Sequence, residues 1–168
     1  MAKSPVPKGY NPVMPYLCVK GAADAIAFYK KAFGAKERYR LKMGDRVGHV
    51  ELDIGGSIVM MSDEFPEMGA KSPKSIGGSP VTLAVMVANT DATVKKAVAA
   101  GATVKRPPTD EFYGYRSAQL VDPFGHVWMV QQLVEDVNPK EMQKRLDAMM
   151  AQVAGDAPQK PAKISKKR

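Results

Sequence analysis

The stretch Arg116–Gln132, RSAQLVDPFGHVWMVQQ, decides the fold of this chain. Two short segments flank the tetrapeptide DPFG at 122–125, where proline sets φ at the second position of a turn and glycine supplies a left-handed residue. The second segment alternates, so that Trp128 points to one face of a strand while Met129 and Gln131 point to the other. The stretch therefore predicts a β-hairpin with one face in a hydrophobic core.

The same order of elements occurs twice along the chain. The first copy is predicted to comprise a strand at 13–20, a helix at 22–33 and strands at 36–43, 47–54 and 57–62. The second comprises a strand at 81–87, a helix at 91–100, a strand that begins at 103–105, a loop at 106–114 and the hairpin at 116–132. Gly34 and Gly101, which end the two helices, keep one register with the Asp-Ala pairs at 24–25 and 91–92. We therefore predict two β-α-β-β-β modules in tandem.

The remaining segments connect or extend the two modules. The Pro-, Gly- and Ser-rich segment at 63–80 is predicted to link a first module at 13–62 to a second at 81–134. Asn138 as N-cap, with Pro139 and Glu141 in the first turn, predicts a C-terminal helix over 138–153. An N-terminal arm at 1–12 and a basic, disordered tail at 155–168 complete the chain.

Composition limits the class of protein. The chain has 168 residues, is 45% hydrophobic and contains no long apolar run, so we expect a globular protein without a transmembrane span. The first twelve residues, MAKSPVPKGYNP, lack the apolar core of a secretory signal. The single cysteine, Cys18, excludes an internal disulfide and a cysteine cluster for zinc. These observations predict a cytoplasmic location and no association with a membrane.

The net charge of +8 is concentrated at one end. The tail from Gly155 to Arg168 contains five basic residues and one acidic residue, which amounts to half of the net charge. The folded part is therefore mildly basic, and no strand combines aromatic and arginine residues as nucleic-acid platforms do. We do not expect nucleic acid as a partner.

Several motifs together resemble a known family. These are the helix end AFYKKAFGA, the stretch GHVELDIGGSIVMMSDE, the loop FYGYRS and the turn DPFGHVW, within paired β-α-β-β-β modules. The combination resembles the vicinal oxygen chelate superfamily, which includes glyoxalases, bleomycin-resistance proteins and dioxygenases, and within it the PhnB-like branch. The resemblance covers about 13–132. It implies an α+β fold in which curved mixed sheets close around a cavity, often shared within a homodimer.

The resemblance also implies where a divalent metal would be held. Metalloenzyme members place histidine- or glutamate-type ligands on four strands, and the corresponding positions here are Met14, Met60, Thr82 and Met129. Thioether sulfur is a soft, weak donor that suits Cu(I) better than a hard divalent cation. We therefore expect no metal cofactor, and we expect the three methionines to line an adaptable apolar cavity.

His49 and Glu51 are the candidates for acid–base chemistry. They share one strand face with Asp53 if Val50 and Leu52 face the helix. Two interpretations remain open at this point: the face is a solvated polar surface, or it is the wall of the cavity, where the residues form an acid–base pair or a non-standard metal site.

Further ligand contacts are expected from four residues. By alternation, Tyr16 shares the face of Met14 and Gln131 that of Met129. Arg116 offers a planar fork for a carboxylate or phosphate at the rim of the cavity; its alternative is an ion pair with Asp110, Glu111 or Asp122. Tyr113 belongs to an aromatic loop that could stack on a flat ligand or cover the edge of the core.

These expectations favour a metal-free binding protein. It would hold a small flat or anionic molecule, as bleomycin-resistance proteins do, and would form a homodimer. The alternative is a glyoxalase-like lyase or isomerase that uses a non-standard site around His49 and Glu51, or Tyr16 with Arg116. The sequence leaves open whether there is turnover.

Overall fold

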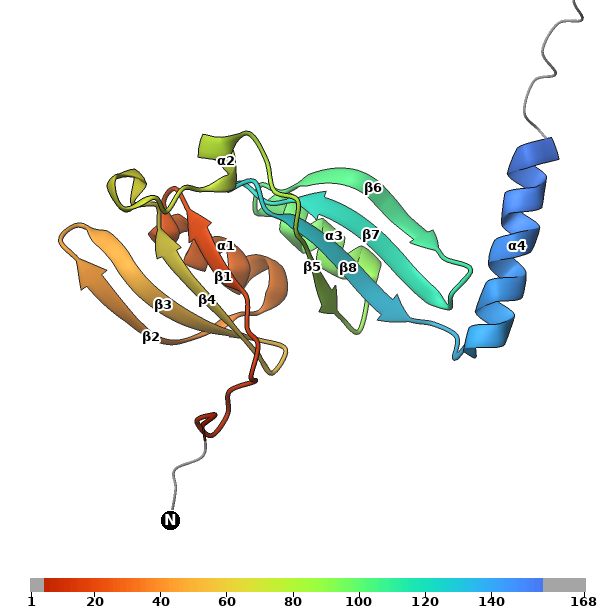
Figure 1. Ribbon diagram of the computed structural model, residues 1–168, viewed down its shortest axis with the longest axis horizontal. Coiled ribbons are helices and arrows are strands. Elements are labelled where there is room, and N and C mark those ends of the chain that lie inside the picture. Colours follow the sequence, from red (N-terminus) through yellow and green to blue (C-terminus); the bar gives the residue numbers. More distant parts are fainter. Residues whose placement is uncertain (1–4, 156–168) are drawn as a thin grey trace, which may run out of the picture.

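The structure is a computed structural model, and it describes residues 5–155. The first module comprises β1 (Tyr16–Val19), α1 (Ala22–Phe33), β2 (Lys36–Met43), β3 (Arg46–Ile54) and β4 (Ser57–Asp63). The second comprises β5 (Thr82–Met86), α3 (Thr90–Ala99), β6 (Thr103–Asp110), β7 (Tyr115–Val121) and β8 (Val127–Leu133) (Figure 1). The linker contains a 3-10 turn, η1 (Pro66–Met68), and a short helix, α2 (Pro73–Ile76); α4 (Pro139–Gly155) follows the second module. The expected basic tail beyond 155 lies outside the described residues.

Each module contains one four-stranded mixed sheet. Sheet 1 has the strand order β1-β4-β3-β2 and sheet 2 the order β5-β8-β7-β6. The first strand of each module pairs parallel with the last, and the other neighbours are antiparallel. This confirms the predicted α+β class with two β-α-β-β-β modules and a C-terminal helix.

A single hydrophobic core joins the two modules. Helix α1 lies against sheet 1, α3 lies against sheet 2, and the two helices contact each other. Tyr29 of α1 is fully buried, and its hydroxyl donates a 2.7 Å hydrogen bond to Asp122 in the turn before β8. The same carboxylate accepts a 2.9 Å bond from Trp128 Nε1. The DPFG turn therefore ties the core of the second module to the helix of the first.

Each sheet has one face that its helix does not cover. On sheet 1 this open face carries Tyr16, Met60, Glu51 and Tyr39, which are cross-strand neighbours in one row. On sheet 2 the open face carries Ala84, Met129, Gln119 and Arg106 in one row, with Gln131 and Ser117 in the next. The two sheets lie side by side in the chain and do not stack on each other (Figure 1).

Two segments differ from the expectations. The linker is not without structure, because η1 and α2 each begin with proline and end at a glycine with positive φ. The predicted loop at 106–114 is wrong in its first half, since β6 continues to Asp110 through Pro107 and Pro108. A strand at the edge of a sheet tolerates proline, because the missing N–H need not face a neighbouring strand.

Helix α4 extends away from the two modules (Figure 1). The Asn138 side chain accepts a hydrogen bond from the backbone N–H of Glu141, which confirms the predicted cap. Arg145 pairs with Glu135 at 2.7 Å and so fixes the first turns of the helix. Further along, Met150 is 57% exposed. Among residues 5–155 no helix is long and apolar enough to span a bilayer.

Candidate functional site

Glu51 is the centre of a polar cluster on the open face of sheet 1. Its side chain is buried, with 1% of its surface exposed, although α1 packs on the opposite face of the sheet. Tyr10, in the segment before β1, donates to both carboxylate oxygens at 3.0 and 2.8 Å. Tyr39 donates to Oε1 at 2.8 Å, and Arg38 donates to Oε2 at 2.9 Å. Protein groups thus replace the water that a buried carboxylate would otherwise need.

A β-bulge brings two consecutive residues to this carboxylate. On β2, Glu37 pairs with Leu52 and Tyr39 with Glu51, so the register shifts at Arg38. A bulge places two residues of one strand opposite one residue of its neighbour. Arg38 and Tyr39 consequently both reach Glu51, which strict alternation along β2 would prevent.

His49 lies between Glu51 and Tyr16. Its Nδ1 is 3.2 Å from the Tyr16 hydroxyl, and its Nε2 is 3.7 Å from Glu51 Oε1. When the hydroxyl donates to Nδ1, the proton of the neutral ring is on Nε2 and faces the carboxylate. The Tyr16 side chain is itself 54% exposed on the open face. The arrangement links a buried carboxylate, through an imidazole, to a phenol that a bound molecule could contact.

The hydrogen bonds keep Glu51 ionised. Burial by itself would raise the pKa of this carboxyl, but the bonds from Tyr39 and Tyr10 and the charge of Arg38 outweigh it, so that the pKa lies below its ordinary value of 4.5. The bond to Glu51 in turn raises the pKa of Tyr39 to about 12. At neutral pH the cluster therefore offers a negative charge surrounded by hydroxyl donors.

The positions at which metalloenzyme members hold a metal do not fit one here. Met60 lies beside Glu51 and Tyr16 on the open face of sheet 1, and Met14 precedes β1. Thr82 and Met129 lie on the other sheet. Thioethers and one hydroxyl do not suit a hard divalent cation. Across residues 5–155 no three His, Cys, Asp or Glu side chains are gathered in a metal-binding geometry.

Asp53 does not extend the His49–Glu51 pair into a metal site. Its carboxylate accepts a 2.8 Å hydrogen bond from the backbone N–H of Gly56 and so stabilises the turn between β3 and β4. Glu51 already accepts bonds from three side chains. The carboxylates of this face therefore do not fit a metal site.

The second sheet contributes a separate set of the expected residues. Met129 and Gln131 lie on its open face together with Thr82, as alternation predicts. Gln131 is buried beside Ser117. Sequence reasoning missed Arg106, which lies on the same face, bonds Ser117 Oγ at 3.3 Å and forms an ion pair with Glu111. The prolines at 107–108 led to the prediction of a loop where β6 carries Arg106.

Arg116 and Tyr113 are not brought to the open faces. Arg116 shares its face with Ala118 and Leu120, and both are buried against the helix side of sheet 2. Its guanidinium pairs with Asp110 at 2.9 Å, which is one of the alternatives that the sequence left open. It also pairs at 2.5 Å with Asp91 at the start of α3, which was not among them. Tyr113 packs among loop aromatics, edge-on to Phe112 and tilted against Tyr115, and Arg145 of α4 bonds the carbonyl of Phe112. Neither residue belongs to the Glu51 cluster.

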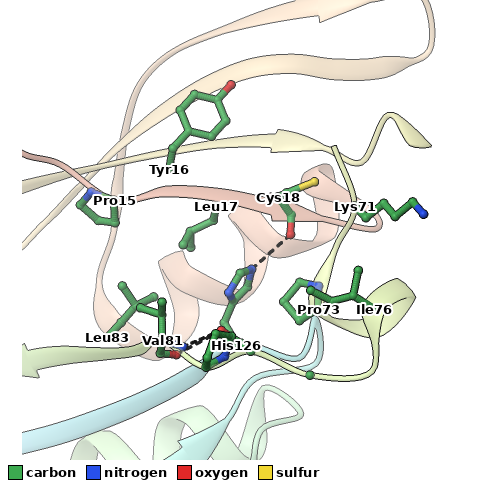
Figure 2. Close-up of a pocket in the computed structure, with 13 residues that line it drawn as sticks. Pro15, Tyr16, Leu17, Cys18, Lys71, Pro73, Ile76, Val81, Leu83 and His126 are labelled. Carbon is green, nitrogen blue, oxygen red and sulfur yellow. Dashed lines mark hydrogen bonds between the residues drawn. The ribbon is translucent and has the colours of Figure 1, made fainter. Parts of the chain in front are cut away.

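An apolar pocket of about 370 Å³ lies between β1, the linker and β5 (Figure 2). Leu17 of β1 points into it toward Val81 and Leu83, whereas the Tyr16 ring points away to the open face. His126 lines the pocket, and a ring nitrogen lies 3.2 Å from the carbonyl oxygen of Cys18. This contact makes His126 a structural link between the modules.

Comparison with known proteins identifies the family. The sequence profile of the Glyoxalase/Bleomycin resistance protein/Dioxygenase superfamily matches residues 9–130. The chain belongs to this superfamily. An uncharacterised relative in Mycobacterium tuberculosis (strain H37Rv) is 43% identical over 138 residues, which is 80% of this chain and 81% of the relative.

Solved structures agree with this membership. An Arabidopsis thaliana gene product, At5g48480, is 30% identical with a TM-score of 0.59, covering 72% of this chain and 98% of that one. A fosfomycin resistance protein from Listeria monocytogenes, solved with Mn(II) and sulfate, is 19% identical with a TM-score of 0.58, covering 81% of this chain and 97% of that one. At that identity the superfamily likeness concerns the fold alone.

Proposed function

We propose that this protein binds a small flat or anionic molecule at the open faces of its sheets, without a metal and without converting it. The Glu51 cluster carries this proposal for a flat ligand, whereas its negative charge disfavours an anion at sheet 1. The buried carboxylate of Glu51, with its hydrogen-bond donors, lies in one row with Met60 and the exposed Tyr16. The face that carries them is the one that α1 does not cover. Such a combination of apolar surface with a few fixed polar groups is typical of ligand sites.

A homodimer would complete the site. In one chain the open faces lie side by side, and they expose large side chains, including Tyr16 at 54% and Met86 at 61%. Sheet faces that expose large apolar side chains are commonly covered by another chain. We propose that the open face of sheet 1 in one copy faces that of sheet 2 in the other, so that the two copies enclose two cavities.

The dimer is tested by light scattering at micromolar concentration. We expect the wild-type protein to be dimeric, and we expect Met86→Glu to be monomeric because it places a charge in the covered face. Val98→Glu is the matched control, since Val98 is 45% exposed on the helix side. A monomeric wild-type protein, or equal dimerisation of both variants, would contradict this arrangement.

Ligand binding is tested with N-phenyl-1-naphthylamine, a flat neutral fluorophore. We expect saturable binding with one site per chain, and an affinity about 10-fold lower in Tyr16→Ala, because a lost aromatic contact costs about 1.4 kcal/mol. Phe112→Ala, in the loop beside α4, should bind as the wild type does. Non-saturable binding, or equal affinities in all three proteins, would argue against the site.

The Tyr16–His49–Glu51 arrangement favours a second candidate, a glyoxalase-like lyase or isomerase. His49 would exchange a proton with a substrate carbon through its own ring or through the Tyr16 hydroxyl, and Glu51 would stabilise the charged imidazole. The assay uses the hemithioacetal of methylglyoxal and glutathione. Turnover by the wild type that is lost in a folded His49→Ala variant would support the enzyme hypothesis. Absence of turnover in the wild type would favour a binding protein.

Three further assignments belong to this proposal. The motifs DPFGHVW and AFYKKAFGA support a place in the PhnB-like branch of the superfamily. Cys18 is unpaired, which suits the reducing cytoplasm. The partners we propose are a small molecule and a second copy of the chain, with neither nucleic acid nor membrane among them.

A further inference from the structure

The N-terminal segment places one of its own side chains in the Glu51 cluster. Between Pro7 and Val13 every residue except Tyr10 is exposed, and Val13 reaches 87%. The Tyr10 hydroxyl bonds both oxygens of Glu51, 41 residues away in the sequence. Along this part of the segment the phenol is therefore the side chain that holds the chain to sheet 1.

The cluster surrounds the ring of Tyr10 as well as its hydroxyl. The guanidinium carbon of Arg38 lies 4.6 Å from the ring centroid, within the range of a cation–π contact. Arg38 at the same time bonds Glu51, so its position over the ring is fixed by the carboxylate. The sheet thus supplies an acceptor for a phenolic O–H and a cation for the face of the ring.

We propose that Glu51 and Arg38 form a binding subsite for neutral hydroxylated aromatic molecules, which Tyr10 fills in the free chain. The inference rests on the proposed function, because it names the class of molecule that the open face of sheet 1 takes. An ionised carboxylate accepts from a hydroxyl donor and repels benzoates and phenolates. The subsite therefore selects the flat, neutral ligands among those proposed above.

A ligand must displace Tyr10 to reach this subsite. The apparent affinity of a phenol is then reduced by the fraction of time for which the subsite is vacant. Tyr16 and Met60, which follow Glu51 across the sheet in the same row, are placed to contact the remainder of a larger aromatic molecule. The segment Pro7–Val13 thereby lowers the apparent affinity of every ligand that must displace Tyr10.

The test uses 4-methylphenol, which reproduces the tyrosine side chain from Cβ outward. Binding is followed by NMR shifts of backbone amides on β3 and β4. We expect the dissociation constant to be at least about 10-fold lower for Tyr10→Ala than for the wild type, because the competing phenol is gone. Toluene, which lacks the hydroxyl, should bind Tyr10→Ala at least about 10-fold more weakly than 4-methylphenol does.

Three variants keep the test decisive. Adding Glu51→Leu to Tyr10→Ala removes the acceptor and should abolish the preference for 4-methylphenol over toluene, and Phe112→Ala should leave the weak wild-type binding unchanged. If Tyr10→Ala does not fold, Tyr10→Phe retains the ring without the hydroxyl and should still bind 4-methylphenol more tightly than the wild type. Equal binding of the two probes to the folded Tyr10 variant would overturn the subsite.

A dimer that binds the fluorophore but shows no preference for 4-methylphenol over toluene would refute the subsite alone. A wild-type protein that neither dimerises nor binds the fluorophore would refute the proposed function.

Discussion

At the scale of single residues, two buried carboxylates have different surroundings. Glu51 accepts from side chains that come from β2 and from the segment before β1, on an open face. Asp122 is enclosed in the core, where its oxygens accept from Tyr29, Trp128 and the backbone N–H groups of residues 124 and 126. The first is placed to meet a ligand, and the second holds the modules together.

Removal of the Asp122 carboxylate should destabilise the protein strongly. We expect Asp122→Ala to lower the free energy of unfolding by about 3 kcal/mol, because several buried donors lose their acceptor. Tyr29→Phe removes one of these hydrogen bonds and should cost about 1 kcal/mol. Urea denaturation measures both values. A loss for Asp122→Ala no larger than that for Tyr29→Phe would contradict the role given to this carboxylate.

The sequence was informative about residues wherever alternation holds. It predicted the faces of Met60, Met129 and Gln131, and the DPFG turn, because strand period and turn chemistry are local properties. It did not predict the partners of Glu51, since Tyr10 arrives from a segment without periodicity and Arg38 through a bulge. Such contacts depend on tertiary structure.

At the scale of elements, the hairpin β6–β7 supports the start of α4. The tip residue Gly114 has a φ of +89°, and its carbonyl accepts from the backbone N–H groups of Val134 and Glu135. A Cβ at this position would overlap the carbonyl of Glu135 and approach Val137 to 2.8 Å. Glycine is therefore required both for the turn and for the passage of the chain into α4.

Substitution of Gly114 should separate these two effects. Gly44→Ala, at a turn with a φ of +60° and free space around it, should cost about 1 kcal/mol of unfolding free energy for the left-handed backbone. Gly114→Ala adds a backbone overlap and should cost at least about 2 kcal/mol more. Thermal denaturation of the two variants measures the difference. Equal melting temperatures would show that the chain before α4 moves aside freely.

At the scale of the whole molecule, the two modules share one core. The Phe33 and Trp128 rings come from different modules, and their centroids are 4.7 Å apart. We expect a single cooperative unfolding transition for this reason. Trp128 is the only tryptophan in the chain, so its fluorescence reports on the contact between the modules, while far-ultraviolet circular dichroism reports on the secondary structure of both. Two midpoints that differ between these signals would indicate modules that unfold independently.

The parallel pairing of β1 with β4 has a consequence for synthesis on the ribosome. Tyr16 can pair with Met60 only after Met60 has been translated, and β5 can likewise pair only after β8 has been made. Tyr29 waits longer still, for Asp122 and Trp128. The aromatic side chains of α1 thus emerge from the exit tunnel well before the residues that will bury them, and the nascent first half must stay free of aggregation until the second half arrives.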